Sequence, residues 1–186
     1  MNKDRFSGSS VVYRPASFYQ VEKDRGTLLI GMDAKGSIVA ASGEEKRIAT
    51  YGLRTCTAVA IAAELPEGLR KGYVQHYNPL RGQVGACALA NTAYSLRADG
   101  AFNVRAVVIT PGEWMRNASG KMMLQPEDSS LVDLLTQTVQ TSLGVEASPY
   151  PYFAEGGSAR GYGYGTLMVE CLADGALNIL AETRRI

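Results

Sequence analysis

Short runs of apolar and β-branched residues, bounded by glycine- or proline-containing turns, recur along most of this 186-residue chain. Such runs are typical of β-strands. The clearest turn, Ala173-Asp174-Gly175, predicts a hairpin between the last two runs. A second hairpin is predicted between 27–32 and 37–41, through the turn Asp33-Ala34-Lys35-Gly36. The predicted strands are 27–32, 37–41, 58–63, 72–77, 104–110, 166–172 and 177–181.

Two stretches have helical patterns instead. The first runs from about Arg81 to Ala98, is rich in alanine and leucine, and is followed by Gly100 at a helix-ending position. In the second, Asp128 or Ser129 caps a helix that Gly144 ends. Its apolar residues lie on one side: Leu131, Leu134, Leu135, Val139 and Leu143.

The order of these elements restricts the fold class. Strands and helices do not alternate strictly as β-α-β units, which argues against a doubly wound parallel sheet. We therefore expect an α+β fold, a mixed β-sheet or sandwich flanked by two main helices. The length predicts one domain at 27–186, after a poorly patterned N-terminal extension at 1–26. Segment 112–126 is either a long functional loop or a short strand pair.

Composition indicates an ordinary globular protein and excludes several function classes. Hydrophobic residues make up 46% and charged residues 20%, with a net charge of +1. This balance gives no argument for nucleic acid, and no apolar run is long enough for membrane insertion. The polar start lacks the apolar region of a secretory signal peptide. The widely spaced cysteines at 56, 87 and 171 suggest reduced thiols, so we expect a cytoplasmic protein. Three dispersed cysteines and one histidine form no metal motif.

The single histidine, His76, limits the chemistry open to the cysteines. A cysteine that attacks a carbonyl at neutral pH needs a base, because the thiolate is the nucleophile. Cys56 follows a glycine turn and precedes the apolar run 58–63, so its sulfur can lie at the rim of a sheet. The alternative is a buried, inert thiol. Cys87 and Cys171, within a predicted helix and the last hairpin, are expected to be packing residues.

The residues around Cys56 and His76 resemble a known family. Thr50-x-Gly52-Leu53-x-Thr55-Cys56, followed by an apolar strand and His76-x-x-Pro79, resembles the CheD family of chemotaxis receptor glutamine deamidases. The core of that family is similar to cytotoxic necrotizing factor and other bacterial toxin deamidases. The resemblance implies a site of cysteine nucleophile, histidine base and threonine, at Cys56, His76 and Thr50. It also implies a protein substrate carrying a glutamine, and no metal or organic cofactor.

The chain departs from the family pattern beside the cysteine. Arg54-Thr55 replaces the usual Gly-Ser, so we expect both residues to contact the substrate. Arg54 either favours the Cys56 thiolate or guides an acidic substrate. The glycine-rich loop 155–165 resembles the glycine- and arginine-containing loop of the family. It lacks the lysine of a phosphate-binding loop, which argues against a nucleotide site. We expect Tyr162 and Tyr164 in this loop to contact the substrate.

Different functions remain open at this point. The family resemblance favours deamidation of a chemotaxis receptor or, for a secreted effector, of a host protein. A cysteine peptidase or transglutaminase uses the same Cys–His pair. A non-enzymatic adaptor that binds a receptor or signalling partner would keep the fold with Cys56 merely buried.

Overall fold

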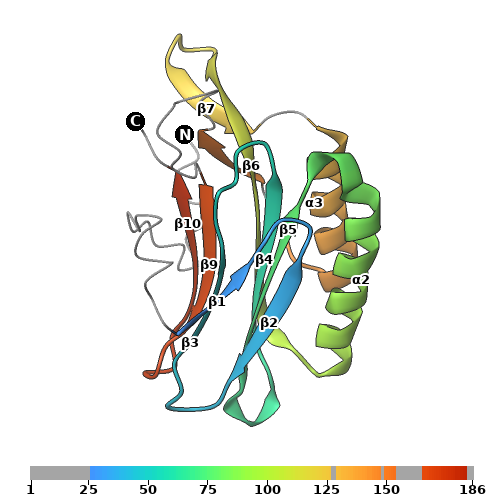
Figure 1. The fold of residues 1–186 in the computed structure, drawn as a ribbon, viewed down its shortest axis with the longest axis vertical. Coiled ribbons are helices and arrows are strands. Elements are labelled where there is room, and N and C mark those ends of the chain that lie inside the picture. Colours follow the sequence, from blue (N-terminus) through green and yellow to red (C-terminus); the bar gives the residue numbers. More distant parts are fainter. Residues whose placement is uncertain (1–25, 127–128, 148, 154–164, 184–186) are drawn as a thin grey trace.

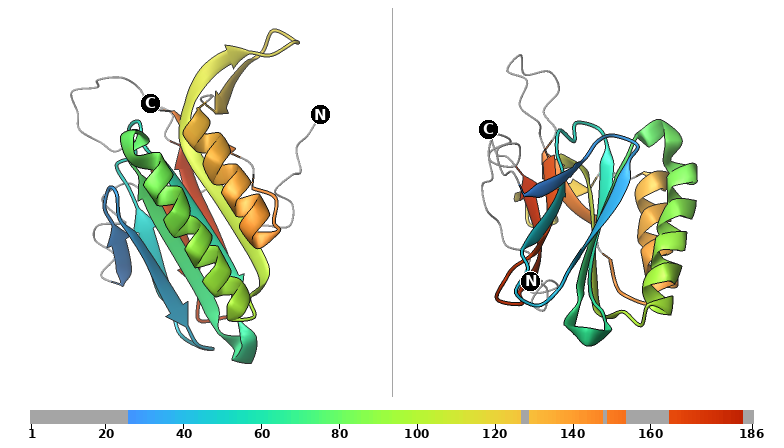
Figure 2. Two further views of the ribbon diagram at one scale, coloured as in Figure 1. Left: turned by 90° about the vertical axis from the view of Figure 1, so that its right-hand side faces the viewer. Right: turned by 60° about the horizontal axis from the view of Figure 1, so that its bottom comes forward.

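Two β-sheets pack face to face in the computed structural model of this chain, which describes residues 26–126, 129–147, 149–153 and 165–183. Helices α2 (Gly82–Ala98) and α3 (Ser130–Leu143) lie side by side on the outer face of the larger sheet (Figure 1, Figure 2). The expected α+β class with two main helices is confirmed. No helix in the described ranges combines the length and apolar character that crossing a membrane requires.

The larger sheet holds the strand that follows the candidate nucleophile and the strand that carries the histidine. Its order is β2-β5-β4-β6-β7, and β8 pairs in parallel with β6. The strands are β2 (Lys35–Ala40), β4 (Thr57–Glu64), β5 (Arg70–Tyr77), β6 (Phe102–Arg116), β7 (Met122–Pro126) and β8 (Pro149–Phe153). Short 3-10 turns, η1 (Pro66–Gly68) and η2 (Pro79–Arg81), each begin with a proline and lie before and after β5.

The smaller sheet has the order β1-β3-β9-β10. Its strands are β1 (Thr27–Ile30), β3 (Lys46–Thr50), β9 (Gly165–Cys171) and β10 (Leu177–Thr183). The predicted C-terminal hairpin is confirmed, because β9 and β10 pair antiparallel from Leu177 opposite Cys171 onward. β1 runs parallel to β3, so this sheet is mixed as well.

The predicted hairpin between 27–32 and 37–41 is wrong. β1 pairs with β3 in the smaller sheet, whereas β2 pairs with β5 in the larger one. The two strands instead meet through side chains: a Cβ added at Gly36 would lie 2.5 Å from Ile30 Cδ1. Because glycine has no side chain, β1 can pack over β2, and the connection forms a corner between the sheets.

β6 is longer than predicted and forms a projecting arm. The sequence suggested that it ends at Pro111-Gly112, but it continues to Arg116 and pairs with β7. Pro111 lies between the last β6 residue paired with β4, Ile109, and the first paired with β7, Gly112, so its missing N–H is tolerated there. Segment 112–126 is therefore a strand pair, which extends beyond both sheets (Figure 1, Figure 2).

Alternating residues of β4 divide the core into two layers. Ala58, Ala60 and Ala62 face the smaller sheet, where Ile48, Val169 and Ile179 complete the packing. The intervening side chains of β4 face the helices and pack with Leu89, Leu135 and Val139. The expected capping of α3 is confirmed, since Ser129 Oγ accepts a hydrogen bond from Val132 N and Gly144 ends the helix in the left-handed region.

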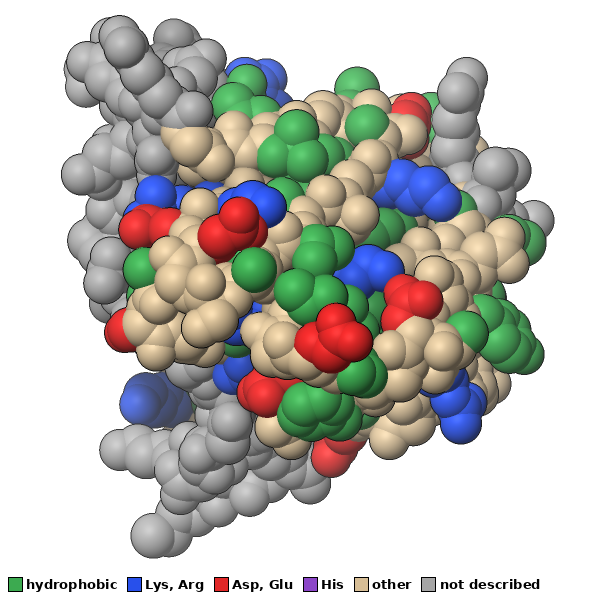
Figure 3. Space-filling model, turned by 90° about the horizontal axis from the view of Figure 1, so that it is seen from below, with side chains coloured by type: hydrophobic (Ala, Val, Ile, Leu, Met, Phe, Trp, Pro, Cys, Tyr) green, Lys and Arg blue, Asp and Glu red, His purple; other side chains and the backbone are tan. Residues whose placement is uncertain are grey.

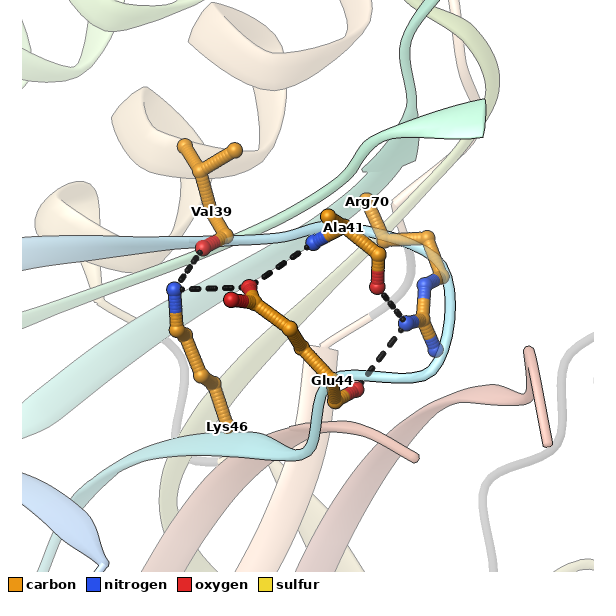
Figure 4. A network of polar contacts seen from close by, with 5 residues as sticks. All are labelled: Val39, Ala41, Glu44, Lys46 and Arg70. Carbon is orange, nitrogen blue, oxygen red and sulfur yellow. Dashed lines mark hydrogen bonds and ion pairs between the residues drawn. The ribbon is translucent and has the colours of Figure 1, made fainter. Parts of the chain in front are cut away.

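A buried arginine secures the end of the sheets far from His76. Arg70 donates hydrogen bonds to the carbonyls of Ala41 at 2.6 Å and Glu44 at 3.0 Å (Figure 4). It also donates to the carbonyl of Leu172. Lys46 donates to Val39 O and pairs with the Glu44 carboxylate. These contacts fix the β2–β3 loop against the β9–β10 turn.

Seen from below, basic and acidic side chains alternate on the described surface (Figure 3).

Candidate active site

The loop that precedes Cys56 crosses from the smaller sheet to the larger one and is held by two hydrogen bonds. Gly52 has a φ of 72°, a conformation that favours glycine, and the fully buried Leu53 donates its N–H to Gly165 O at 3.3 Å. Tyr152 donates its hydroxyl hydrogen to Cys56 O at 2.7 Å. A Cβ at Gly165 would lie 3.1 Å from both Leu53 and Tyr152, so this glycine makes room for the anchors. Cys56 is therefore rigidly placed just before β4.

Strand register places His76 beside Cys56. In the antiparallel pair of β4 and β5, Thr57 lies opposite Tyr77 and Ala58 opposite His76. Cys56 shares the face of Ala58, so Cys56 and His76 are diagonal neighbours, which in such pairs are separated by about 7–8 Å. Both side chains are buried, with 8% of Cys56 and 4% of His76 exposed. No described side chain forms a hydrogen bond with His76 Nε2, and that includes the Cys56 thiol.

The third residue of the expected site comes from the facing sheet. Thr50, the last residue of β3, is fully buried, and its Oγ1 lies 2.9 Å from His76 Nδ1 and 2.8 Å from Ile30 O. The hydroxyl has one hydrogen, which it must donate to the carbonyl oxygen of Ile30, so it accepts a hydrogen bond from Nδ1–H. This network assigns the proton of the neutral ring to Nδ1 and leaves a lone pair on Nε2.

The turn between β1 and β2 closes over the site, a feature that sequence reasoning missed. Met32 Sδ lies 3.9 Å from Cys56 Sγ, while Asp33 Oδ1 accepts a hydrogen bond from Asn78 N at 3.1 Å. The backbone N–H of His76 donates to Ala34 O at 3.0 Å. The sequence predicted a turn here, but its position depends on the corner between the sheets, and no local signal indicates it.

Burial favours the neutral forms of both Cys56 and His76. It raises the pKa of the Cys56 thiol, and the nearby Asp33 carboxylate raises it further, while a backbone hydrogen bond from Thr55 acts in the opposite direction. Burial also lowers the pKa of His76, which Asp33 partly opposes. The resting pair is therefore thiol and imidazole rather than thiolate and imidazolium. Such a pair can act by proton transfer to Nε2 as the sulfur attacks.

The residues predicted to contact the substrate are either exposed or lie outside the described part of the chain. Arg54 and Thr55 are exposed, and Arg54 is not among the groups that shift the pKa of Cys56. Tyr162 and Tyr164 lie outside the described residues, as does most of the 1–26 extension.

The two remaining cysteines differ in their surroundings. Cys171 is buried as expected, but the prediction that Cys87 is a packing residue is wrong because Cys87 is exposed on α2. Among the side chains of that helix that the structure describes, the buried ones are Ala86, Leu89, Ala93 and Leu96, a stripe to which Cys87 does not belong.

Comparison with known proteins adds no family assignment. No family model matches the chain, and no curated protein has a significantly similar sequence. Among the described residues, no group of three histidine, cysteine, aspartate or glutamate side chains is arranged to hold a metal ion.

Proposed function

We propose that this protein is a cysteine-dependent protein glutamine deamidase in which Cys56 is the nucleophile, His76 the base and Thr50 the positioning residue. The observation that carries the proposal is the chain of hydrogen bonds from His76 Nδ1 through Thr50 to Ile30 O. It leaves Nε2 as the free base, on the same sheet face as Cys56. This arrangement agrees with the roles that the CheD resemblance implies for the same positions.

The reaction follows from these groups. His76 Nε2 takes the thiol proton while Cys56 Sγ attacks the carbon of the glutamine carboxamide. The tetrahedral intermediate collapses when the imidazolium returns the proton to the nitrogen, which leaves as ammonia. Water, deprotonated by His76, then cleaves the thioester and yields glutamate and the free thiol.

The loop around Cys56 is suited to stabilise the oxyanion. The backbone of Thr55 acts to lower the pKa of the Cys56 thiol, so an amide group of this loop favours negative charge at the sulfur. One such donor typically lowers the barrier by about 2.7–4 kcal/mol. The Leu53 and Tyr152 anchors hold this loop in place, so little reorganisation is needed when negative charge develops.

Substrate entry requires a local movement at Met32. Its thioether contacts the Cys56 sulfur, yet Met32 as a residue is 59% exposed, so its side chain can rotate away without disturbing the core. Catalytic hydrogen bonds are often long before substrate binds. A rotation of the Cys56 side chain toward Nε2 accompanies this opening.

The substrate is a protein, either a chemotaxis receptor in a bacterial cytoplasm or a host protein reached by a secreted effector. Arg54 is exposed beside the nucleophile and guides an acidic substrate by Coulomb attraction. Replacement Arg54→Ala should then reduce kcat/KM most at low salt while leaving the alkylation profile of Cys56 unchanged. A raised pKa of Cys56 in that variant would instead assign Arg54 to thiolate stabilisation.

Mass spectrometry of treated proteomes tests the proposal. The full chain is incubated with lysates of bacterial and host cells, and glutamines converted to glutamate are sought. Conversion should require Cys56 and His76, so Cys56→Ser and His76→Gln serve as inactive variants and Cys87→Ser as the matched thiol control. Cleavage of peptide bonds, or glutamine conversion that Cys56→Ser retains, would reject the assignment.

A non-enzymatic adaptor is the second candidate, and the projecting arm favours it. Trp114, Met115, Met122 and Met123 are all exposed on the β6–β7 pair, and aromatic residues and methionine are enriched at interfaces. In this case Cys56→Ser would leave partner binding unchanged, and no Cys56-dependent ammonia release would be found with any bound partner.

A further inference from the structure

The outer edge of β7 is suited to pair with a second copy of itself. Among the strands that the structure describes, β7 pairs only with β6 and ends the larger sheet. The β6–β7 arm projects beyond both sheets, so another molecule can reach this edge (Figure 1, Figure 2). We propose that two copies of this chain form a dimer by antiparallel pairing of their β7 strands about a two-fold axis at Leu124. The dimer goes beyond the proposed deamidation and does not depend on it.

The tip of the arm determines which backbone groups of β7 face outward. The N–H of Asn117 donates to Lys121 O at 2.9 Å, and the N–H of Gly120, which has a φ of 77°, donates to Asn117 O at 2.9 Å. Asn117 and Lys121 therefore form the closing hydrogen-bonded pair of the hairpin. Hydrogen-bonded and non-hydrogen-bonded pairs alternate along an antiparallel ladder. The residues of β7 whose backbone groups point away from β6 are consequently Met122, Leu124 and Pro126.

These outward groups match one another when two β7 strands pair antiparallel about Leu124. The two Leu124 residues form a hydrogen-bonded pair, in which each N–H donates to the carbonyl of the other. Met122 of each copy lies opposite Pro126 of the other, and the Met122 N–H donates to the Pro126 carbonyl. Proline has no N–H, and at this place it only has to accept. This register pairs all five residues of β7.

The charges of the arm lie away from the paired edge. β7 has no charged side chain, although natural edge strands are commonly protected by lysine or other charges. Glu113 and Arg116 lie on β6, so each is separated from its counterpart in the second copy by three strand spacings, about 14 Å. That distance exceeds the Debye length of about 8 Å at physiological salt. The two copies of Lys121 lie at opposite ends of the paired strands.

Pairing also extends the apolar rows of side chains on both faces of the arm. Trp114 lies opposite Leu124, so their row continues across the axis through Leu124 and Trp114 of the second copy. On the other face Met115 lies opposite Met123, and these side chains are 50% and 44% exposed in the single chain. A strand of five residues spans only about 17 Å. The interface is therefore smaller than a standard one, and we expect a reversible dimer.

Exchange of charge at Leu124 tests both the dimer and its axis. All chains carry Cys87→Ser, which excludes disulfide-linked dimers through the exposed thiol. In sedimentation equilibrium at rising concentration, the parent should go from the single-chain mass of 19.9 kDa to twice that mass. Leu124→Lys and Leu124→Glu should each stay at the single-chain mass, because like charges then lie directly opposite each other. An equimolar mixture of the two variants should dimerise again, since opposite charges then face each other across the axis.

Gln140→Lys is the matched control, because it adds the same charge on the exposed face of α3 and should leave the dimer unchanged. Circular dichroism compares the folding of all variants. A parent that keeps the single-chain mass, a dimer retained in Leu124→Lys, or a mixture that stays monomeric would each overturn the proposal. A parent mass that grows beyond two chains would also overturn it, since the two-fold pairing is closed.

Hydrogen exchange followed by NMR provides a readout that needs no change at the edge. The N–H groups of Met122 and Leu124 should become protected as the concentration of the parent rises. Those of Met123 and Gln125 already face β6, so their exchange should change little. Equal behaviour of the two sets would contradict the pairing. Neither experiment uses a glutamine substrate, so a dimer without ammonia release would refute only the deamidase proposal.

Discussion

Replacing Thr50 by valine tests the hydrogen-bond chain that orients His76. Valine has nearly the same shape but leaves two buried groups without a partner, the carbonyl of Ile30 and the Nδ1–H of His76. Each unpaired group costs about 1–3 kcal/mol, and the added methyl returns about 1 kcal/mol. The expected loss of stability is therefore about 1–5 kcal/mol. Its central value of about 3 kcal/mol corresponds to a fall in Tm of about 6–12 °C for a chain of this size.

Thr50→Ser is the matched control because it keeps the hydroxyl and loses only a methyl group, worth about 0.8 kcal/mol. Thermal and urea unfolding compare the two variants with the parent. The chain has one histidine, so ¹⁵N labelling of histidine reports the His76 tautomer directly. The parent and Thr50→Ser should have the proton on Nδ1. Equal stability of both variants, or a proton on Nε2 in the parent, would refute the reasoning.

Three further substitutions test the surroundings of the site. Asp33→Asn should lower the pKa of both Cys56 and His76, because the carboxylate raises both; the pH dependence of iodoacetamide alkylation and histidine NMR measure the two shifts. Tyr152→Phe leaves the Cys56 carbonyl unpaired and should cost about 1–3 kcal/mol in urea unfolding, with an unchanged value counting against the loop anchor. Arg70→Met should cost more than about 2 kcal/mol yet keep the Cys56 alkylation rate, since Arg70 lies at the far end of β5; a large rate change would contradict this separation.

Local signals predicted the elements that local interactions form. Ser129 and Gly144 mark the ends of α3 because capping depends on neighbouring backbone groups. The Ala173-Asp174-Gly175 turn needs only its own residues, with Leu172 N bound to Ala176 O. The glycine turn before Cys56 was also predicted from sequence, and Gly52 there has a φ of 72°.

Contacts between distant strands were not predictable in the same way. A turn was predicted at Asp33-Ala34-Lys35-Gly36, but the structure has it at Gly31–Ala34, and Lys35 and Gly36 already belong to β2. A turn signal is the same whether the flanking strands pair with each other or enter different sheets. The pairing of β1 with β3 and of β2 with β5, with Ile30 packed over Gly36, belongs to the corner. The contact of Met32 with Cys56 follows from that corner. For this reason neither Met32 nor Asp33 was predicted to lie at the site. Similarly, a proline usually ends a strand, so the sequence predicted an end near Pro111. Only the sheet shows that Pro111 lies between the part of β6 that pairs with β4 and the part that pairs with β7.

Ammonia release measured together with glutamate formation tests the central claim most directly. On a target protein identified by mass spectrometry, the parent should form one ammonia for each glutamine converted, and Cys56→Ser should fall to the background rate because the alcohol is a far poorer nucleophile. A Cys56→Ser variant that is folded and releases ammonia at the parent rate would contradict the assignment of Cys56.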